Sequence, residues 1–237
     1  MAEGSGNGRA AFPAPLAAYR AEVLRWNSQI NLVSRQEPAR RLDALIDQCD
    51  RAFSALVAAY PQTIAGSVLY CDLGAGGGLP GFIWHERLLR EAGRAASWLV
   101  EPREKRAWFL ERVARLGGPP AYGVLQGRWG AVAAAMAEPV DTVLISLKAL
   151  RLTDAEVLEG LAALRQGLGT LSGRVVIARF QPPETAWTVD LATALGWAGA
   201  GQPLGPWRGA DAAVLPVEGL GRGDAALAVC SYAAGAA

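Results

Sequence analysis

Two acidic residues stand at the ends of two apolar runs, and the first comes directly before a loop rich in glycine. Asp72 closes the run "VLYCD" and precedes "LGAGGGLPG", and Glu101 closes the run "SWLVE". In an open α/β sheet, ligands bind beyond the carboxyl ends of the strands, where glycines let the backbone approach closely. We therefore expect a ligand-binding site made by Asp72, Glu101 and the loop between them.

The glycine spacing alone leaves the ligand open. Gly76, Gly78 and Gly81 satisfy G-x-G-x-x-G, and Glu101 follows at the distance typical of a dinucleotide-binding fold. Asp72 favours S-adenosylmethionine, because a carboxylate attracts the ammonium and sulfonium groups of that molecule and repels a pyrophosphate. A dinucleotide site and a purely structural glycine turn remain the alternatives.

The expected cofactor site extends over three strand-end loops. We expect Glu101 to accept hydrogen bonds from both ribose hydroxyls, and the loop "GRWG" to lay a tryptophan ring or backbone against adenine. The predicted cofactor-binding residues are Asp72, Gly74, Ala75, Gly76, Gly78, Leu79, Glu101, Trp129 and Gly130.

The alternation of short apolar runs with longer amphipathic segments predicts the elements that position these residues. Five such units follow Val68 and indicate a doubly wound, mostly parallel α/β sheet flanked by helices. The runs "AAVLPVEG" and "DAALAVCSY" predict a closing antiparallel hairpin, which brings the sheet to seven strands. Upstream, apolar residues at helical spacing predict a helical cap. The expected organisation is a disordered tail over 1–14, the cap over 15–63 and the sheet domain over 64–237.

Length, composition and charge limit the classes of protein to which this chain can belong. The chain has 237 residues, of which 51% are hydrophobic and 19% charged, so it has material for a sizeable core. The net charge of +1 indicates no polyanion partner, although the segment 101–128 carries a local excess of basic residues. Pro61 and Gly66 interrupt the longest uncharged run, which excludes a membrane-spanning helix there. The first residues lack a secretory pattern, so we expect the cytoplasm.

Few side chains suit metal binding or acid–base catalysis. Three widely separated cysteines in apolar runs are expected to be reduced core residues: Cys49, Cys71 and Cys230. His85 is the only histidine, and we expect a partly exposed helix residue there rather than a catalytic one. No metal site is predicted. Three tryptophans at apolar periodic positions are expected in the core: Trp26, Trp98 and Trp108.

Several segments together resemble one protein family. They are Trp26-Asn27 with Asn31-Leu32, "DLGAGGGLPG", "EKRAWFL" at Glu104 to Leu110, and Gly127-Arg128. In this order they resemble the bacterial small-subunit ribosomal RNA guanine-N7 methyltransferase G family, also called the glucose-inhibited division protein B family. The resemblance implies a Rossmann-like class I methyltransferase domain behind an N-terminal helical extension. It also implies methyl transfer from S-adenosylmethionine to N7 of a guanine in small-subunit ribosomal RNA.

Two strand ends depart from the family pattern. Strand four ends in "ISLKAL" where the family has Ser-Arg-Ala, and strand five runs into "ARFQPP" where the family has Lys-Gly. Lys148 and Arg179 are the residues that could supply the charges of the family's Arg and Lys. The expected substrate-binding residues are Arg103, Arg128, Ser146, Lys148 and Arg179.

The expected chemistry needs no catalytic side chain. Guanine N7 already carries an in-plane lone pair, so methylation requires alignment of the reactants and no general base. Two other functions stay open: methylation of a small molecule or protein, and a non-catalytic assembly factor that binds S-adenosylmethionine or RNA. The sequence does not indicate an oligomeric state.

Overall fold

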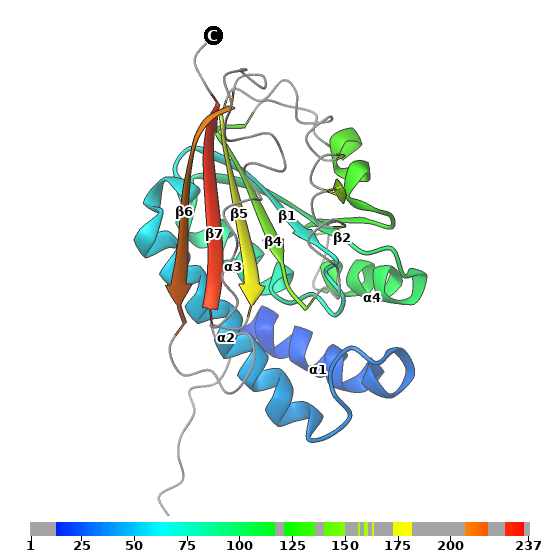
Figure 1. The fold of residues 1–237 in the computed structure, drawn as a ribbon. Helices are drawn as coiled ribbons and strands as arrows, with labels where there is room; N and C mark the ends of the chain where they lie inside the picture. The colour runs from blue at the N-terminus through cyan, green and yellow to red at the C-terminus, as the bar shows by residue number, and fades with distance from the viewer. Residues whose placement is uncertain are drawn as a thin grey trace, which may run out of the picture.

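Seven strands form a single sheet in the order β3-β2-β1-β4-β5-β7-β6 (Figure 1). Their bounds are β1 Ser67–Leu73, β2 Arg94–Val100, β3 Gly123–Leu125, β4 Thr142–Leu147, β5 Arg174–Gln181, β6 Trp207–Pro216 and β7 Ala226–Ala234. Strands β1 to β5 pair in parallel, whereas β7 is antiparallel to both β5 and β6. The predicted α/β class and the closing hairpin are confirmed.

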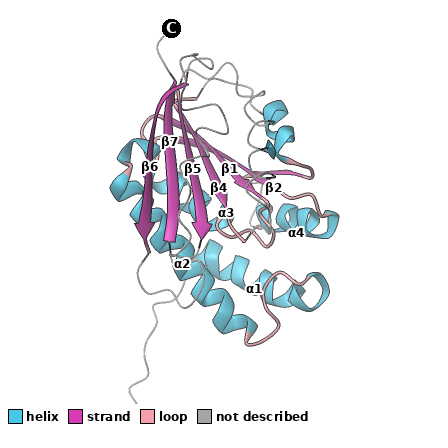
Figure 2. Cartoon of the chain, viewed as in Figure 1, coloured by secondary structure: helices cyan, strands magenta, loops and turns pink. Residues whose placement is uncertain are grey.

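The computed structural model describes residues 13–116, 121–135, 140–149, 156, 159–160, 163, 173–181, 207–217 and 226–234. The helices whose bounds the structure gives are α1 Ala14–Ile30, α2 Pro38–Ala59, α3 Gly81–Glu91 and α4 Glu104–Ala114, with the short 3₁₀ helices η1 Pro61–Ile64 and η2 Trp129–Ala135 (Figure 2). Residues 1–12 of the tail predicted over 1–14, and most of the segments expected as helices after β4 and β5, lie outside the described residues, and α1 begins at Ala14.

Strand β1 lies between β2 and β4, and the three strands end at the same edge of the sheet. Asp72 is the register partner of Leu99 in β2 and of Ser146 in β4. Glu101 comes directly after the last residue of β2. The two acidic residues singled out in the sequence therefore stand at the ends of adjacent parallel strands.

The two N-terminal helices lie across this edge of the sheet (Figure 1). Helix α1 packs against α4, and α2 packs against α3. Trp84 in α3 joins the layers, because its ring lies 5.7 Å from that of Phe53 in α2 and 5.8 Å from that of Phe180 in β5. The cap thus shares one apolar core with the sheet. The division into a cap and a methyltransferase domain at residue 63 remains a prediction.

Two expectations about burial were wrong. His85 is buried, because its face of α3 packs onto β2, where the Nδ1 atom lies 2.9 Å from the Ser97 hydroxyl oxygen. Trp108 is 44% exposed, because it lies on the outer face of α4. Trp26 and Trp98 are partly buried.

The sequence also led to expectations about the cysteines, about metal binding and about a membrane-spanning helix. Cys49 and Cys71 are buried, as expected, and neither forms a disulfide among the described residues, whereas the side chain of Cys230 lies outside the described part of the chain. The described residues contain no cluster of side chains suited to a metal ion and no helix that is long and apolar enough to cross a membrane.

Candidate cofactor and substrate site

The glycine loop after β1 has a backbone that favours glycine at three positions. Gly74, Gly76 and Gly78 have φ angles of 78°, 57° and 96°, in the region that side chains with a Cβ rarely adopt. The loop is tied to β2, because the N–H groups of Gly74 and Ala75 donate to the Val100 carbonyl oxygen at 2.8 and 3.0 Å. The loop therefore crosses the end of the sheet between the two acidic residues.

Asp72 is buried and holds the start of helix α3. Its Oδ2 atom accepts a hydrogen bond of 2.9 Å from the Gly81 N–H, and its Oδ1 atom accepts one of 2.6 Å from the Ser146 hydroxyl. Position 81 has no room for a side chain, since a Cβ there would lie 2.6 Å from Asp72 Oδ2. Ser146 is itself buried and 2.8 Å from the Tyr70 hydroxyl. Ser146 thus positions the Asp72 carboxylate.

The surroundings of Asp72 favour the protonated carboxyl group. Its pKa is raised to about 7, chiefly by burial and to a smaller extent by the charge of Glu101. The hydrogen bonds from Ser146 and Gly81 and the charge of Lys148 act in the opposite direction. A cationic ligand group beside this carboxylate would favour its ionised form.

Glu101 is fully buried and holds the other part of the loop. Its Oε2 atom accepts a hydrogen bond of 2.9 Å from the Gly76 N–H. Its Oε1 atom accepts hydrogen bonds from the Arg103 N–H at 3.0 Å and from Arg103 Nε at 3.1 Å. Asp72 and Glu101 thus hold the glycine-rich segment at Gly81 and at Gly76, from two adjacent strands.

The helical cap also contacts this loop. The Tyr19 hydroxyl in α1 donates a hydrogen bond of 2.8 Å to the Gly77 carbonyl oxygen, and its ring stacks on Phe82 at 4.4 Å. Leu32 lies against Gly77. The Arg106 guanidinium donates to the Asn31 carbonyl oxygen at 2.9 Å and so ties α4 to the same turn.

The family-like residues at the end of α1 explain the shape of that turn. The Asn27 side-chain oxygen accepts hydrogen bonds of 2.8 Å from the N–H groups of both Leu32 and Val33. Asn31 adopts a left-handed conformation and ends the helix. These residues therefore deliver Leu32 to the glycine loop.

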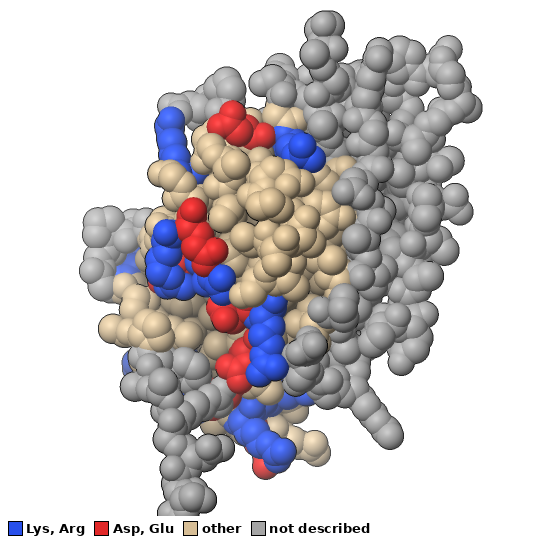
Figure 3. Space-filling model, turned by 90° about the vertical axis from the view of Figure 1, so that its left-hand side faces the viewer, with Lys and Arg blue, Asp and Glu red and all other residues tan. Residues whose placement is uncertain are grey.

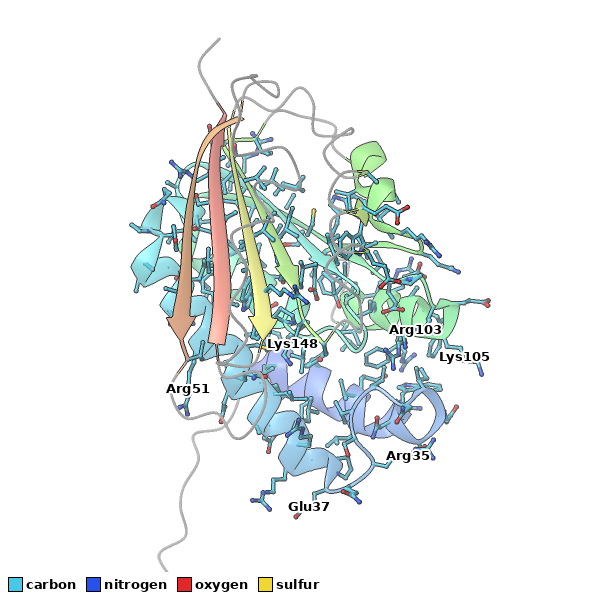
Figure 4. The ribbon with its side chains drawn as sticks, in the orientation of Figure 1. Arg35, Glu37, Arg51, Arg103, Lys105 and Lys148 are labelled. Carbon is cyan, nitrogen blue, oxygen red and sulfur yellow. The ribbon has the colours of Figure 1, made fainter. Side chains whose placement is uncertain are left out.

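The predicted substrate residues divide by exposure. Lys148, directly after β4, is 8% exposed and its Nζ atom lies 5.3 Å from the centre of the Phe180 ring (Figure 4). Arg179 is partly buried in β5, where it is the register partner of Leu147. Arg128 is exposed on the loop before η2. These residues lie near or just beyond the carboxyl ends of three parallel strands, β3, β4 and β5.

Trp129 and Gly130, the residues predicted to contact adenine, differ in exposure. The Trp129 ring is 9% exposed and lies against Gly160, where a Cβ would be 2.1 Å from the indole. Gly130 is exposed. The Trp129 ring therefore packs onto the protein, and the Gly130 backbone is the accessible part of the predicted pair.

The strand order, the glycine loop after β1 and the acidic residues ending β1 and β2 define a Rossmann-like methyltransferase of class I. The family model described as rRNA small subunit methyltransferase G matches residues 14–155. The chain belongs to this family, and the resemblance seen in the sequence is confirmed.

Individual relatives agree with the family. A ribosomal RNA small subunit methyltransferase G from Rhodospirillum centenum (strain ATCC 51521 / SW) is 33% identical over 178 residues, which cover 73% of either chain. Another, from Parvibaculum lavamentivorans (strain DS-1 / DSM 13023 / NCIMB 13966), is 34% identical over 107 residues, which cover 45% of this chain and 43% of the relative. The solved structure of MtNAS in complex with MTA and tNA shares the fold, with a TM-score of 0.51 and 13% identity over 92% of this chain and 70% of that one.

Proposed function

We propose that this protein transfers a methyl group from S-adenosylmethionine to N7 of a guanine in small-subunit ribosomal RNA. The observation that carries the cofactor assignment is the pair of buried carboxylates, Asp72 and Glu101, on either side of the glycine loop. The family supports ribosomal RNA as the substrate, since the matching relatives are named for it.

The donor and acceptor groups of the site suit this cofactor. A carboxylate has about four lone-pair positions, and Asp72 uses two of them within the protein. It can therefore also accept a hydrogen bond from an ammonium group. Glu101 accepts three hydrogen bonds, one of them from the guanidinium of Arg103, whose side chain is 64% exposed. If Arg103 turns into solvent, Glu101 gains room for the two ribose hydroxyls.

The residues of this chain contribute alignment rather than proton transfer. Bound S-adenosylmethionine supplies an electrophilic methyl group on its sulfonium. Guanine N7 would accept that methyl group through its own lone pair, with S-adenosylhomocysteine as the leaving group, so no residue of this chain would have to remove a proton. Holding reactants in line can lower a barrier by roughly 7 to 11 kcal/mol. The loop fixed by Asp72 and Glu101 and the basic group of Lys148 would provide that alignment.

Basic side chains at the strand ends support an RNA substrate. Lys148 and Arg179 stand where the family has other basic residues, and Arg128 is exposed after β3, which β2 and β1 separate from β4. We propose that these residues receive phosphate oxygens or the guanine edge. Ser146 would affect binding indirectly, by holding the Asp72 carboxylate in position, because its buried hydroxyl donates a hydrogen bond to that carboxylate.

A labelling experiment with three acceptors tests the proposal. The protein is incubated with methyl-labelled S-adenosylmethionine and either small ribosomal subunits, naked small-subunit RNA or a small-molecule extract. We expect label in the RNA of the first or second sample. Label in protein or in small molecules would overturn the RNA assignment, and tight NAD binding in calorimetry would overturn the cofactor assignment.

A further inference from the structure

The outer face of helix α4 carries a row of basic and aromatic side chains that the cofactor site does not use. Lys105, Trp108, Arg112 and Arg115 are spaced three, four and three residues apart, which places them along one side of the helix. Trp108 and Leu116 are two of the most exposed large apolar side chains among the described residues. We call this row the α4 surface.

Trp108 is held in place from one side. Its ring meets Trp26 of α1 edge-on, with ring centroids 4.8 Å apart and an angle of 77°. Trp26 donates its indole N–H to Glu22 at 3.0 Å, and Arg112 forms an ion pair of 2.5 Å with the same carboxylate. Trp108 is thus fixed by its neighbours although 44% of it remains exposed. A pre-positioned aromatic ring loses little conformational entropy when a flat ligand stacks on it.

The surface beside Trp108 is hollowed. A depression of about 400 Å³ is lined by Trp108, Glu111, Arg112, Arg115 and Leu116. Its lining therefore joins an aromatic ring and two guanidinium groups on one side of the helix. That combination suits a nucleobase with its phosphate.

The charges of the α4 surface favour a polyanion. The segment 103–116 contains five basic and two acidic residues. Lys105 and Arg115 are exposed, and no carboxylate partner is found for them among the residues that the structure describes. On helix α3, by contrast, Arg87 and Arg90 are both paired with acidic side chains. Acidic and basic side chains are likewise interspersed on the face shown in Figure 3.

We propose that the α4 surface binds an unpaired segment of the substrate RNA outside the methyl-transfer site. One base stacks on the exposed side of Trp108, while Arg115 and Lys105 contact phosphate oxygens. This inference rests on the proposed RNA substrate. The position agrees with it, because α4 begins three residues after Glu101, and Arg103 and Lys105 lie on the same side of the molecule (Figure 4).

Substitution of Trp108 tests the stacking contact. We expect Trp108→Ala to raise the KM for small-subunit RNA about tenfold, because the variant loses the aromatic ring on which a base stacks. Trp108→Phe should recover most of the affinity. The matched control is Leu89→Ala on α3, which also removes an exposed apolar side chain and should leave the KM unchanged. Calorimetry with S-adenosylhomocysteine verifies that each variant keeps a folded cofactor site.

Substitution of Arg115 tests the phosphate contact. Arg115→Ala should reduce the dependence of RNA affinity on salt by about one counterion, with Arg90→Ala on α3 as its control. If wild-type protein binds the cofactor but methylates no RNA, the proposed function fails. If wild-type protein methylates RNA and Trp108→Ala has an unchanged KM, only the α4 inference fails. A defect with intact small subunits but not with naked RNA would show a ribosomal protein as the partner and would also overturn the inference.

Discussion

Tyr19 in the N-terminal helix donates a hydrogen bond to the carbonyl oxygen of Gly77, 58 residues away in the cofactor loop. Three successive glycines make peptide rotation easy in this loop, because glycine adopts both signs of φ. The Tyr19 hydroxyl therefore selects one orientation of the peptide that joins Gly77 to Gly78. The neighbouring ring contact with Phe82 keeps the hydroxyl in place.

Tyr19→Phe should weaken binding of S-adenosylmethionine by about fivefold, since a single hydrogen bond contributes about 1 kcal/mol and a less populated loop conformation lowers apparent affinity. The matched control is Tyr122→Phe. Tyr122 is also buried and its hydroxyl donates to a backbone carbonyl, that of Leu110, rather than to the loop. Both variants should unfold at a slightly lower temperature than wild type. Only Tyr19→Phe should lose affinity for S-adenosylmethionine in calorimetry. Equal affinity of the two variants would contradict this role of Tyr19.

The sequence predicted the strand ends better than it predicted what their side chains contact. Asp72 and Glu101 could be located because each follows an apolar run that fits a buried strand. Their partners Gly81, Gly76 and Arg103 depend on how the loop folds back, and no local pattern shows this.

The contribution of the cap was predictable only in part. Apolar residues at helical spacing predicted the helical cap, but the hydrogen bond from Tyr19 to Gly77 depends on tertiary packing across the edge of the sheet. Trp108 and His85 were misplaced for a related reason. Apolar periodicity gives the buried face of a helix only approximately, and neither the contact with Trp26 nor the packing of α3 on β2 appears in the sequence.

The Asp72 carboxyl group should make stability depend on pH. Its folded pKa of about 7 lies above its ordinary value, so its contribution to stability is complete below about pH 4 and is lost as the pH rises through about 7. The Asp72→Asn side chain resembles the protonated carboxyl group, so the variant should not lose this stability as the pH rises. The free energy of unfolding of the variant relative to wild type should therefore increase by about 4 kcal/mol between pH 4 and pH 8. A constant difference over this range in urea titrations would contradict the proposed environment of Asp72.

The same carboxyl group should link cofactor binding to proton release. An ammonium group beside Asp72 favours the ionised form, so binding near pH 6.5 should release protons. Calorimetry in buffers of different ionisation enthalpy measures the number of protons released per molecule of cofactor bound. The Asp72→Asn variant should bind more weakly and release fewer protons, whereas identical proton release by the two proteins would assign the linkage to another group.

His85 should have the opposite pH dependence. Burial lowers its pKa to about 4, so its contribution to stability is present above about pH 6.5 and is lost as the pH falls through about 4. His85→Gln should lack most of this acid destabilisation, which amounts to about 3 kcal/mol. Free energies of unfolding measured at pH 4 and pH 7 for wild type and His85→Gln would show this difference. Parallel changes in the two proteins would mean that folding does not lower the pKa of His85.

Glu101 and Arg103 should separate cofactor affinity from RNA affinity. Glu101→Gln should weaken S-adenosylmethionine and S-adenosylhomocysteine by the same factor, about tenfold, because contacts with the ribose do not change during methyl transfer. Arg103→Ala should keep or slightly increase both affinities, since it removes a competitor for Glu101, and it should raise the KM for RNA. A loss of cofactor affinity in Arg103→Ala equal to that in Glu101→Gln would place the guanidinium in the cofactor site instead.

The position of the transferred methyl group tests the central claim most directly. Small-subunit RNA is treated with the protein and S-adenosylmethionine, reduced with borohydride and exposed to aniline, which cleaves the strand at N7-methylguanine. We expect a single new cleavage site that requires both protein and cofactor and that weakens with Lys148→Ala at unchanged cofactor affinity. Methyl label in RNA without cleavage would contradict N7 as the acceptor, and absence of label from the RNA would contradict the proposed function.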